Sequence, residues 1–170
     1  MHCFAVLTLL AASAVAEYVG ESPSYSFDPP VGSGSGTPYS ISGEGRITAV
    51  RVWDNYNYVY GLQFRYGTVW SPRAGIQVGI IKEFELLEGE VIVQVSGKYS
   101  HYVNWLVFVT SLGRSMFNGQ PSGHSFNMYA PKGSELVILS GRYHGALTSV
   151  GAHWAVIPQP DSNSSNSKHL

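Results

Sequence analysis

The chain has 170 residues, a length typical of one domain, and its 10 basic and 11 acidic residues give a net charge of −1 at pH 7. Charged residues make up only 12% of the sequence, which argues against nucleic acid as a partner because binding to phosphates needs a basic face. Aromatic residues at 13% and a total of 19 glycines indicate an all-β protein with many tight turns.

The first 16 residues have the pattern of a secretory signal peptide. An apolar run over 4–12 leads into Ala-Val-Ala at 14–16, a small-x-small cleavage pattern before Glu17. The run is shorter than the roughly 20 apolar residues that a membrane-spanning helix needs, and no later stretch reaches that length. The only cysteine, Cys3, lies within this segment. We therefore expect a secreted protein that is not transmembrane and that folds without a disulfide.

The following segment, 17–30, is weakly patterned, and we expect it to be weakly ordered. From Val31 to Trp154 nothing predicts a helix, and short apolar runs bounded by glycines predict strands. The expected strands include the stretches 47–52, 62–66, 92–95, 106–109, 136–139 and 150–154.

Two similar tetrapeptides, SGKY at 96–99 and SGRY at 140–143, each follow an apolar strand. The two tetrapeptides are 44 residues apart, and a step of 43 residues back from Tyr99 aligns Tyr56 with it, so the chain divides into three degenerate units of about 43 residues. This period also suits propeller blades, but a propeller needs about four of them. Three small antiparallel sheets around a threefold axis, each burying its inner face against the other two, form a closed prism. A two-sheet sandwich is the alternative, because its strands are equally short.

The tail, 159–170, is rich in serine and asparagine and is expected to be disordered. Asn163 begins an Asn-Ser-Ser sequence, which is an N-glycosylation acceptor that is either used or unused. The expected organisation is thus a signal peptide (1–16), an N-terminal segment (17–30), one domain (31–158) and the tail.

Candidate catalytic groups are scarce. Two of the three aspartates lie in the terminal segments, so a Ser-His-Asp triad lacks a well-placed acid. The pairs Glu83/Glu85 and Glu88/Glu90 could serve a glycosidase, but a solvated edge or turn is the favoured interpretation. We expect no catalytic residues and no enzyme activity.

Metal and nucleotide sites are not indicated either. The stretch 32–36, GSGSG, is followed by Pro38 and strand-like sequence, whereas a phosphate-binding loop precedes a helix. No cofactor is expected. Four histidines lack metal-ligand spacing and cysteine companions, namely His101, His124, His144 and His153.

The glycine stretch 32–36 suits a sugar site better, although a flexible linker has the same composition. In a threefold prism it would lie beside the polar turns of the other two units, at 98–102 and 143–148. Backbone N–H groups, hydroxyls and tyrosine rings match the hydroxyls and C–H faces of a neutral sugar.

Five segments carry a family resemblance: VYGLQFRYGTVWS (59–71), VIVQVSGKY (91–99), LVFVTSLGR (106–114), SGHSFN (122–127) and SGR…GAHW (140–154). In this order they resemble the jacalin-related lectins, in particular their animal secretory branch. The resemblance implies an all-β fold of the β-prism I type, with three four-stranded antiparallel Greek-key sheets and pseudo-threefold symmetry. It also implies calcium-independent binding of mannose-type glycans at one end of the prism, and residence in secretory granules or mucus.

The family site consists of a glycine-rich loop, a recognition loop and a binding loop of the form Gly-x-x-x-Asp. By resemblance these correspond to Gly34, Ser35 and Gly36; to Lys98, Tyr99, Ser100, His101 and Tyr102; and to His144, Gly145, Ala146, Leu147 and Thr148. Thr148 stands where relatives have the aspartate, three residues before Gly151. Hydrogen bonds to a charged group contribute about 1.5–3 kcal/mol, against about 1 for neutral pairs. Threonine is therefore expected to weaken mannose binding by about one or two powers of ten.

The expected partners are mannose-type or related glycans of granules, mucus or microbes, with altered specificity. Few basic residues remain near the site (Lys98, Arg142 and Arg51), so sulfated glycosaminoglycans are a weak candidate. The alternative is a prism-fold protein that no longer binds sugar and packs granules through protein contacts. Thr148 favours this alternative, whereas the retained GSGSG and SGKY loops favour the lectin.

Overall fold

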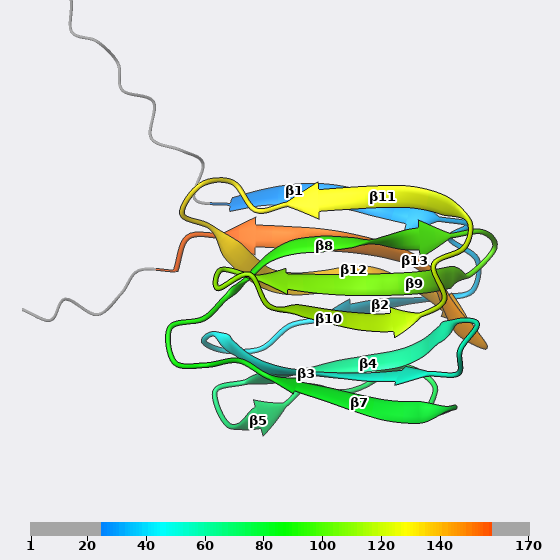
Figure 1. Cartoon of the computed structure of the whole chain (residues 1–170), viewed down its shortest axis with the longest axis horizontal. Coiled ribbons are helices and arrows are strands. Elements are labelled where there is room, and N and C mark those ends of the chain that lie inside the picture. Colours follow the sequence, from blue (N-terminus) through cyan, green and yellow to red (C-terminus); the bar gives the residue numbers. More distant parts are fainter. Residues whose placement is uncertain (1–24, 158–170) are drawn as a thin grey trace, which may run out of the picture.

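The computed structural model describes residues 25–157, which form thirteen strands (Figure 1). The expected signal peptide, most of the segment 17–30 and the tail with Asn163 lie outside these residues. None of the described residues belongs to a helix that could cross a membrane.

The strands form three antiparallel sheets, each built on a central hairpin with a further strand on either side. The first sheet has the order β1 (Tyr25–Gly32), β13 (Ala146–Ala155), β12 (Glu135–His144) and β2 (Thr37–Ile41). The second has β10 (Ser115–Gly119), β9 (Val103–Thr110), β8 (Ile92–Tyr99) and β11 (His124–Tyr129). The third has β5 (Val69–Trp70), β4 (Val59–Tyr66), β3 (Ile47–Asp54) and β7 (Ile80–Glu85), with β6 (Ala74–Gly75) also pairing with β4. The predicted β-prism is confirmed, and β6 makes the third sheet five-stranded.

The core lies between the three sheets, where each contributes alternate residues of its central hairpin. Phe64 of β4 and Phe108 of β9 are fully buried and meet edge to face, with ring centroids 5.8 Å apart. Trp154 of β13 is 1% exposed and completes the third side. Burial of this alternating set holds the sheets together and fixes which ends of the hairpins face the same way.

The first strand begins at Tyr25, so it includes six residues of the segment that the sequence placed before the domain. The ladder between β1 and β13 shifts register between Asp28 and Val31, at two prolines, which edge strands tolerate because their N–H groups need not pair. Asp28 accepts a hydrogen bond from Trp154 Nε1 at 2.6 Å, which fastens the strand to the core.

The three sequence units correspond to the three central hairpins, but the alignment of Tyr56 with Tyr99 is wrong. Asp54 ends β3 and pairs with Val59, as Tyr99 ends β8 and pairs with Val103. Tyr56 lies in the turn beyond β3 and is 65% exposed, because this turn is one residue longer than the β8–β9 turn.

Candidate functional site

The glycine stretch and the turns of all three central hairpins gather at one end of the prism, on the right in Figure 1. We call this the loop end. It comprises residues 32–36, 55–58, 99–102, 120–123 and 144–145. Both ends of the described chain lie at the opposite end, which we call the far end (Figure 1). The three loops assigned by resemblance therefore share one face of the molecule.

The glycine loop, 32–36, lies against the β12–β13 hairpin. A Cβ on Gly36 would stand 2.1 Å from the Tyr143 carbonyl oxygen, so only glycine permits this approach. Gly34 differs, because a Cβ there would meet nothing within 4 Å and its N–H donates to the Thr148 carbonyl at 3.3 Å. The loop is thus seated on the hairpin at Gly36 and open to solvent above Gly34.

Thr148 lies beneath the glycine loop. Its side chain is fully buried, and Oγ1 donates a hydrogen bond to the Ser35 carbonyl at 2.6 Å. Ala146 and Leu147 are buried as well, whereas His144 and Gly145 are exposed at the tip of the turn. The hydroxyl of Thr148 thus holds the loop in place.

The β8–β9 turn lies on the other side of the glycine loop. Ser33 Oγ donates to the His101 carbonyl at 2.7 Å, and Ser100 N–H donates to the Tyr102 carbonyl at 2.9 Å, which closes the turn. His101 is exposed and Tyr102 is half-buried. Lys98 lies within β8, opposite Trp105 of β9, rather than in the turn itself. The glycine loop is hydrogen-bonded to both neighbouring turns.

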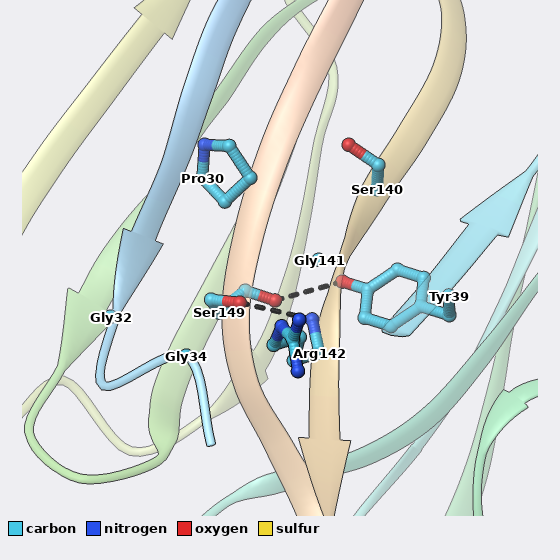
Figure 2. Close-up of a pocket in the computed structure, with 8 residues that line it drawn as sticks. All are labelled: Pro30, Gly32, Gly34, Tyr39, Ser140, Gly141, Arg142 and Ser149. Atoms are coloured by element: carbon cyan, nitrogen blue, oxygen red, sulfur yellow. Dashed lines mark hydrogen bonds between the residues drawn. The ribbon is translucent and has the colours of Figure 1, made fainter. Parts of the chain in front are cut away.

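A hollow of about 290 Å³ adjoins the glycine loop over the β12–β13 sheet, as Figure 2 shows. The Tyr39 hydroxyl donates to the Ser149 carbonyl at 3.0 Å, and Ser149 Oγ accepts from the Arg142 N–H at 2.9 Å. The guanidinium of Arg142 donates to the Gly36 carbonyl at 2.8 Å. The residues that line the hollow are Pro30, Gly32, Gly34, Tyr39, Ser140, Gly141, Arg142 and Ser149.

Burial raises the pKa of Tyr39 far above its ordinary value, so its hydroxyl stays a neutral donor at all physiological pH values. The sequence analysis did not assign Tyr39, Ser140 or Ser149 to the site, although Ser140 begins the SGRY repeat. These residues come together only through pairing of β2 and β13 with β12, which no pattern along the chain reveals.

A second hollow, of about 480 Å³, lies at the far end between β2 and β5. Its wall includes Tyr66, whose hydroxyl donates to the carbonyls of Ile41 and Val137 at 3.1 and 2.7 Å. It also includes Trp70, whose ring centroid lies 3.9 Å from Cζ of Arg51. It does not adjoin any of the loops assigned by resemblance.

Three of the four carboxylates considered for catalysis, Glu83, Glu85 and Glu90, are held in ion pairs, and Glu88 is exposed. Glu83 pairs with Arg51 at 2.9 Å, and Glu85 pairs with Arg65 at 2.5 Å. Hydrogen bonding to Arg114 lowers the pKa of Glu90 to about 2, which leaves no proton for general acid catalysis near neutral pH. Within residues 25–157, no group of three His, Cys, Asp or Glu side chains could hold a metal ion.

Comparison with known proteins gives a consistent family. Residues 29–153 match the family model of the jacalin-like lectin domain. The chain is 42% identical over 162 residues to zymogen granule membrane protein 16 of Rattus norvegicus and to that of Homo sapiens, covering 93% of this chain and 96% of each relative. It is 32% identical over 129 residues to prostatic spermine-binding protein of Rattus norvegicus, covering 73% of this chain and 46% of that protein.

Comparison with solved structures gives the same fold. The crystal structure of a prostate-specific WGA16 glycoprotein lectin has a TM-score of 0.69 and 27% identity, covering 78% of this chain and all of that one. An artocarpin–mannotriose complex shares the fold, with a TM-score of 0.67 at 19% identity, covering 79% of this chain and 99% of that one. The chain therefore belongs to the family of jacalin-like lectin domains, which are carbohydrate-binding proteins.

Proposed function

We propose that the loop end binds neutral glycans of the mannose type or close relatives of them, without calcium. The observation that carries this proposal is the seating of the glycine loop between two turns, open above Gly34. Backbone groups, hydroxyls and aromatic rings surround that opening, and these are the groups that bind a neutral sugar.

The affinity for a single mannose is expected to be weak. Position 148 has a threonine in place of a carboxylate, and the hydroxyl of Thr148 is already hydrogen-bonded to the Ser35 carbonyl. Several sites acting together would compensate for a weak one. Sulfated glycosaminoglycans remain a weak candidate, because Lys98 lies within β8 and Arg142 is engaged with the glycine loop.

The protein acts, in this proposal, outside the cell or in the lumen of secretory granules or mucus, on glycans of these compartments or of microbes. Residues 1–16 would be removed as a signal peptide, and the domain would end near residue 158, before the tail. The names of three relatives, zymogen granule membrane proteins 41–42% identical to this chain, support the granule assignment.

A glycan array tests the proposal directly. The chain from Glu17 onward, displayed multivalently, should bind mannose-type spots equally with and without EDTA. Asparagine tolerates a positive φ, so Gly34→Asn (φ 65°) should fold and yet place a side chain in the opening, and its binding should be lost. Gly67→Asn (φ 57°), equally open but at the far end, is the matched control and should bind normally.

Uniformly blank spots for the wild-type chain at high valency would reject sugar binding. Such a result would favour the second candidate, a prism-fold protein that works through protein contacts. The observation that favours this candidate is the burial of Thr148, whose hydroxyl donates to the Ser35 carbonyl and is not accessible to a sugar.

A further inference from the structure

Aromatic rings from two different hairpin turns form a continuous row at the loop end. The Tyr60 and Tyr58 ring centroids are 6.2 Å apart, Tyr58 and Tyr102 are 4.8 Å apart, and Tyr102 and His101 are 4.6 Å apart at 89°. We call these four residues the aromatic ridge. It crosses from the β3–β4 hairpin of the third sheet to the β8–β9 turn of the second.

The ridge is continuous with the glycine loop. Its last member, His101, accepts the hydrogen bond from Ser33 Oγ through its carbonyl at 2.7 Å. A ligand that occupies the opening above Gly34 therefore has the ridge beside it, leading away from the β12–β13 hairpin. Tyr58 and Tyr60 are not among the site residues that were predicted from the sequence or from the family resemblance.

The ridge and its surroundings are accessible. His101 is exposed, and the three tyrosines are half-buried, so each ring is supported on one side and open on another. Asn55 and Asn57 are exposed in the same turn and add amide groups. Rings supported in this way lose little conformational freedom when a ligand packs against them.

The turn that carries Tyr58 also has an unusual backbone. Tyr56 is the only described non-glycine residue with a positive φ, 51°, and its side chain is 65% exposed. Bulky residues rarely adopt this conformation, and such outliers cluster at binding sites. Folding alone gives no reason to keep a large exposed ring there, where glycine or asparagine would cost less.

The turns at this face are uncharged, and the nearby guanidinium of Arg142 is engaged with the Gly36 carbonyl at 2.8 Å. None of the five loop-end stretches contains Asp, Glu, Lys or Arg. The carboxylate that directly precedes the 55–58 turn, Asp54, is 2% exposed and is bound by Lys82 Nζ at 2.6 Å and by the Gly119 N–H at 2.7 Å. Single-stranded nucleic acid also stacks on aromatic rings, but it needs basic groups for its phosphates. A chain of neutral sugars matches rings, hydroxyls and amides without charge.

From these contacts we infer that the aromatic ridge is a second subsite, which binds the further sugars of an oligosaccharide whose first sugar lies at the glycine loop. The inference rests on the proposed function and deepens it: the ligand is a neutral glycan chain of several sugars rather than a single one. Stacking on the ridge supplies affinity that the buried Thr148 does not.

Titration with methyl α-mannoside and with linear manno-oligosaccharides of two to five sugars tests the subsite. The wild-type dissociation constant should fall by at least about ten-fold from the monosaccharide to the pentasaccharide. Tyr58→Ala should remove most of this gain and leave the monosaccharide unchanged, whereas Tyr58→Phe, which keeps the ring, should retain it. Tyr129→Ala, which removes a tyrosine that is 61% exposed on β11, is the matched control and should behave as wild type.

A spectroscopic readout covers the case in which Tyr58→Ala fails to fold. In the wild-type chain, the ring NMR signals of Tyr58 and Tyr60 should shift with the pentasaccharide but not with methyl α-mannoside. Equal affinity for all lengths, or ring signals that do not move, would overturn the subsite while leaving the glycine-loop site intact. Absence of binding to every member of the series would overturn the subsite and the mannose-type function together.

Discussion

The two ends of the prism are built with different chemistry. At the far end, Arg46 pairs with Glu135 at 2.8 Å and Arg114 pairs with Glu90 at 2.8 Å, with both carboxylates nearly buried. At the loop end, the glycine loop is held by hydrogen bonds from hydroxyls and N–H groups to backbone carbonyls, as at Thr148, and the adjoining ion pair of Lys82 with Asp54 has its carboxylate 2% exposed. The first arrangement joins sheets through charges, and the second joins loops while leaving a neutral surface. The turns at the loop end themselves carry no Asp, Glu, Lys or Arg.

The largest expected contrast between the ends concerns two glycines with similar backbone angles. Gly36 (φ 90°) would place a Cβ 2.1 Å from a carbonyl oxygen, whereas Gly133 (φ 81°) has open space around it. Gly36→Ala should abolish glycan binding and lower the free energy of unfolding by about 3 kcal/mol, since a clash adds to the strain. Gly133→Ala should cost only about 1 kcal/mol and leave binding intact. Urea unfolding and glycan titration measure both, and equal losses would refute the close approach at Gly36.

A smaller effect is expected from the hydroxyl beneath the glycine loop. Thr148→Val keeps the shape but removes the donor to the Ser35 carbonyl, which should cost about 1–2 kcal/mol and weaken glycan binding about ten-fold. Thr148→Ser retains the hydroxyl and should restore most of both. If Thr148→Val binds glycan as well as wild type, the hydroxyl does not position the loop.

At the far end, the corresponding test is how the free energy of unfolding depends on pH. The pKa of Glu90 is lowered to about 2 from 4.5 by Arg114, so its contribution to stability is present above about pH 4.5 and is lost as the pH falls toward 2. Glu135 acts oppositely, because burial raises its pKa. Glu90→Gln should be less stable than wild type at pH 7, and this difference should shrink between pH 4.5 and 2. A constant difference in urea midpoint across this range would exclude the ion pair as its cause.

The smallest expected effect is that of salt on glycan binding. Because the loop end carries no Asp, Glu, Lys or Arg in its turns, raising NaCl from about 50 to 500 mM should change the affinity less than about two-fold. Arg142→Gln, measured in parallel, reports whether the guanidinium beside the glycine loop contributes. A steep fall in affinity with salt would point to an anionic glycan instead.

The sequence predicted the larger part of the fold, because the three units repeat their strand–turn–strand pattern and a closed prism is what three such units can form. It also placed the glycine loop beside two turns. It did not find β1 before Val31, since two consecutive prolines hide an edge strand from pattern analysis.

Other features could not be read from the chain because they depend on contacts between distant segments. The Tyr39 hydroxyl meets Ser149 across the first sheet, and the Tyr58 ring meets Tyr102 from a different sheet. Thr148 was expected in the binding loop by resemblance, but the burial of its side chain depends on how the glycine loop lies over it. Sequence patterns describe periodicity along one element, whereas these contacts are set by the packing of one element on another.

The position of the chain ends has a practical consequence. Tyr25 starts β1 and Ile157 follows β13 at the far end, so attachment of the domain through either end of the described chain turns the loop end outward (Figure 1). Many copies fixed to one support in this way would all present their loop ends in the same direction. Such a layer would capture a glycan-coated particle firmly even where each individual contact is brief.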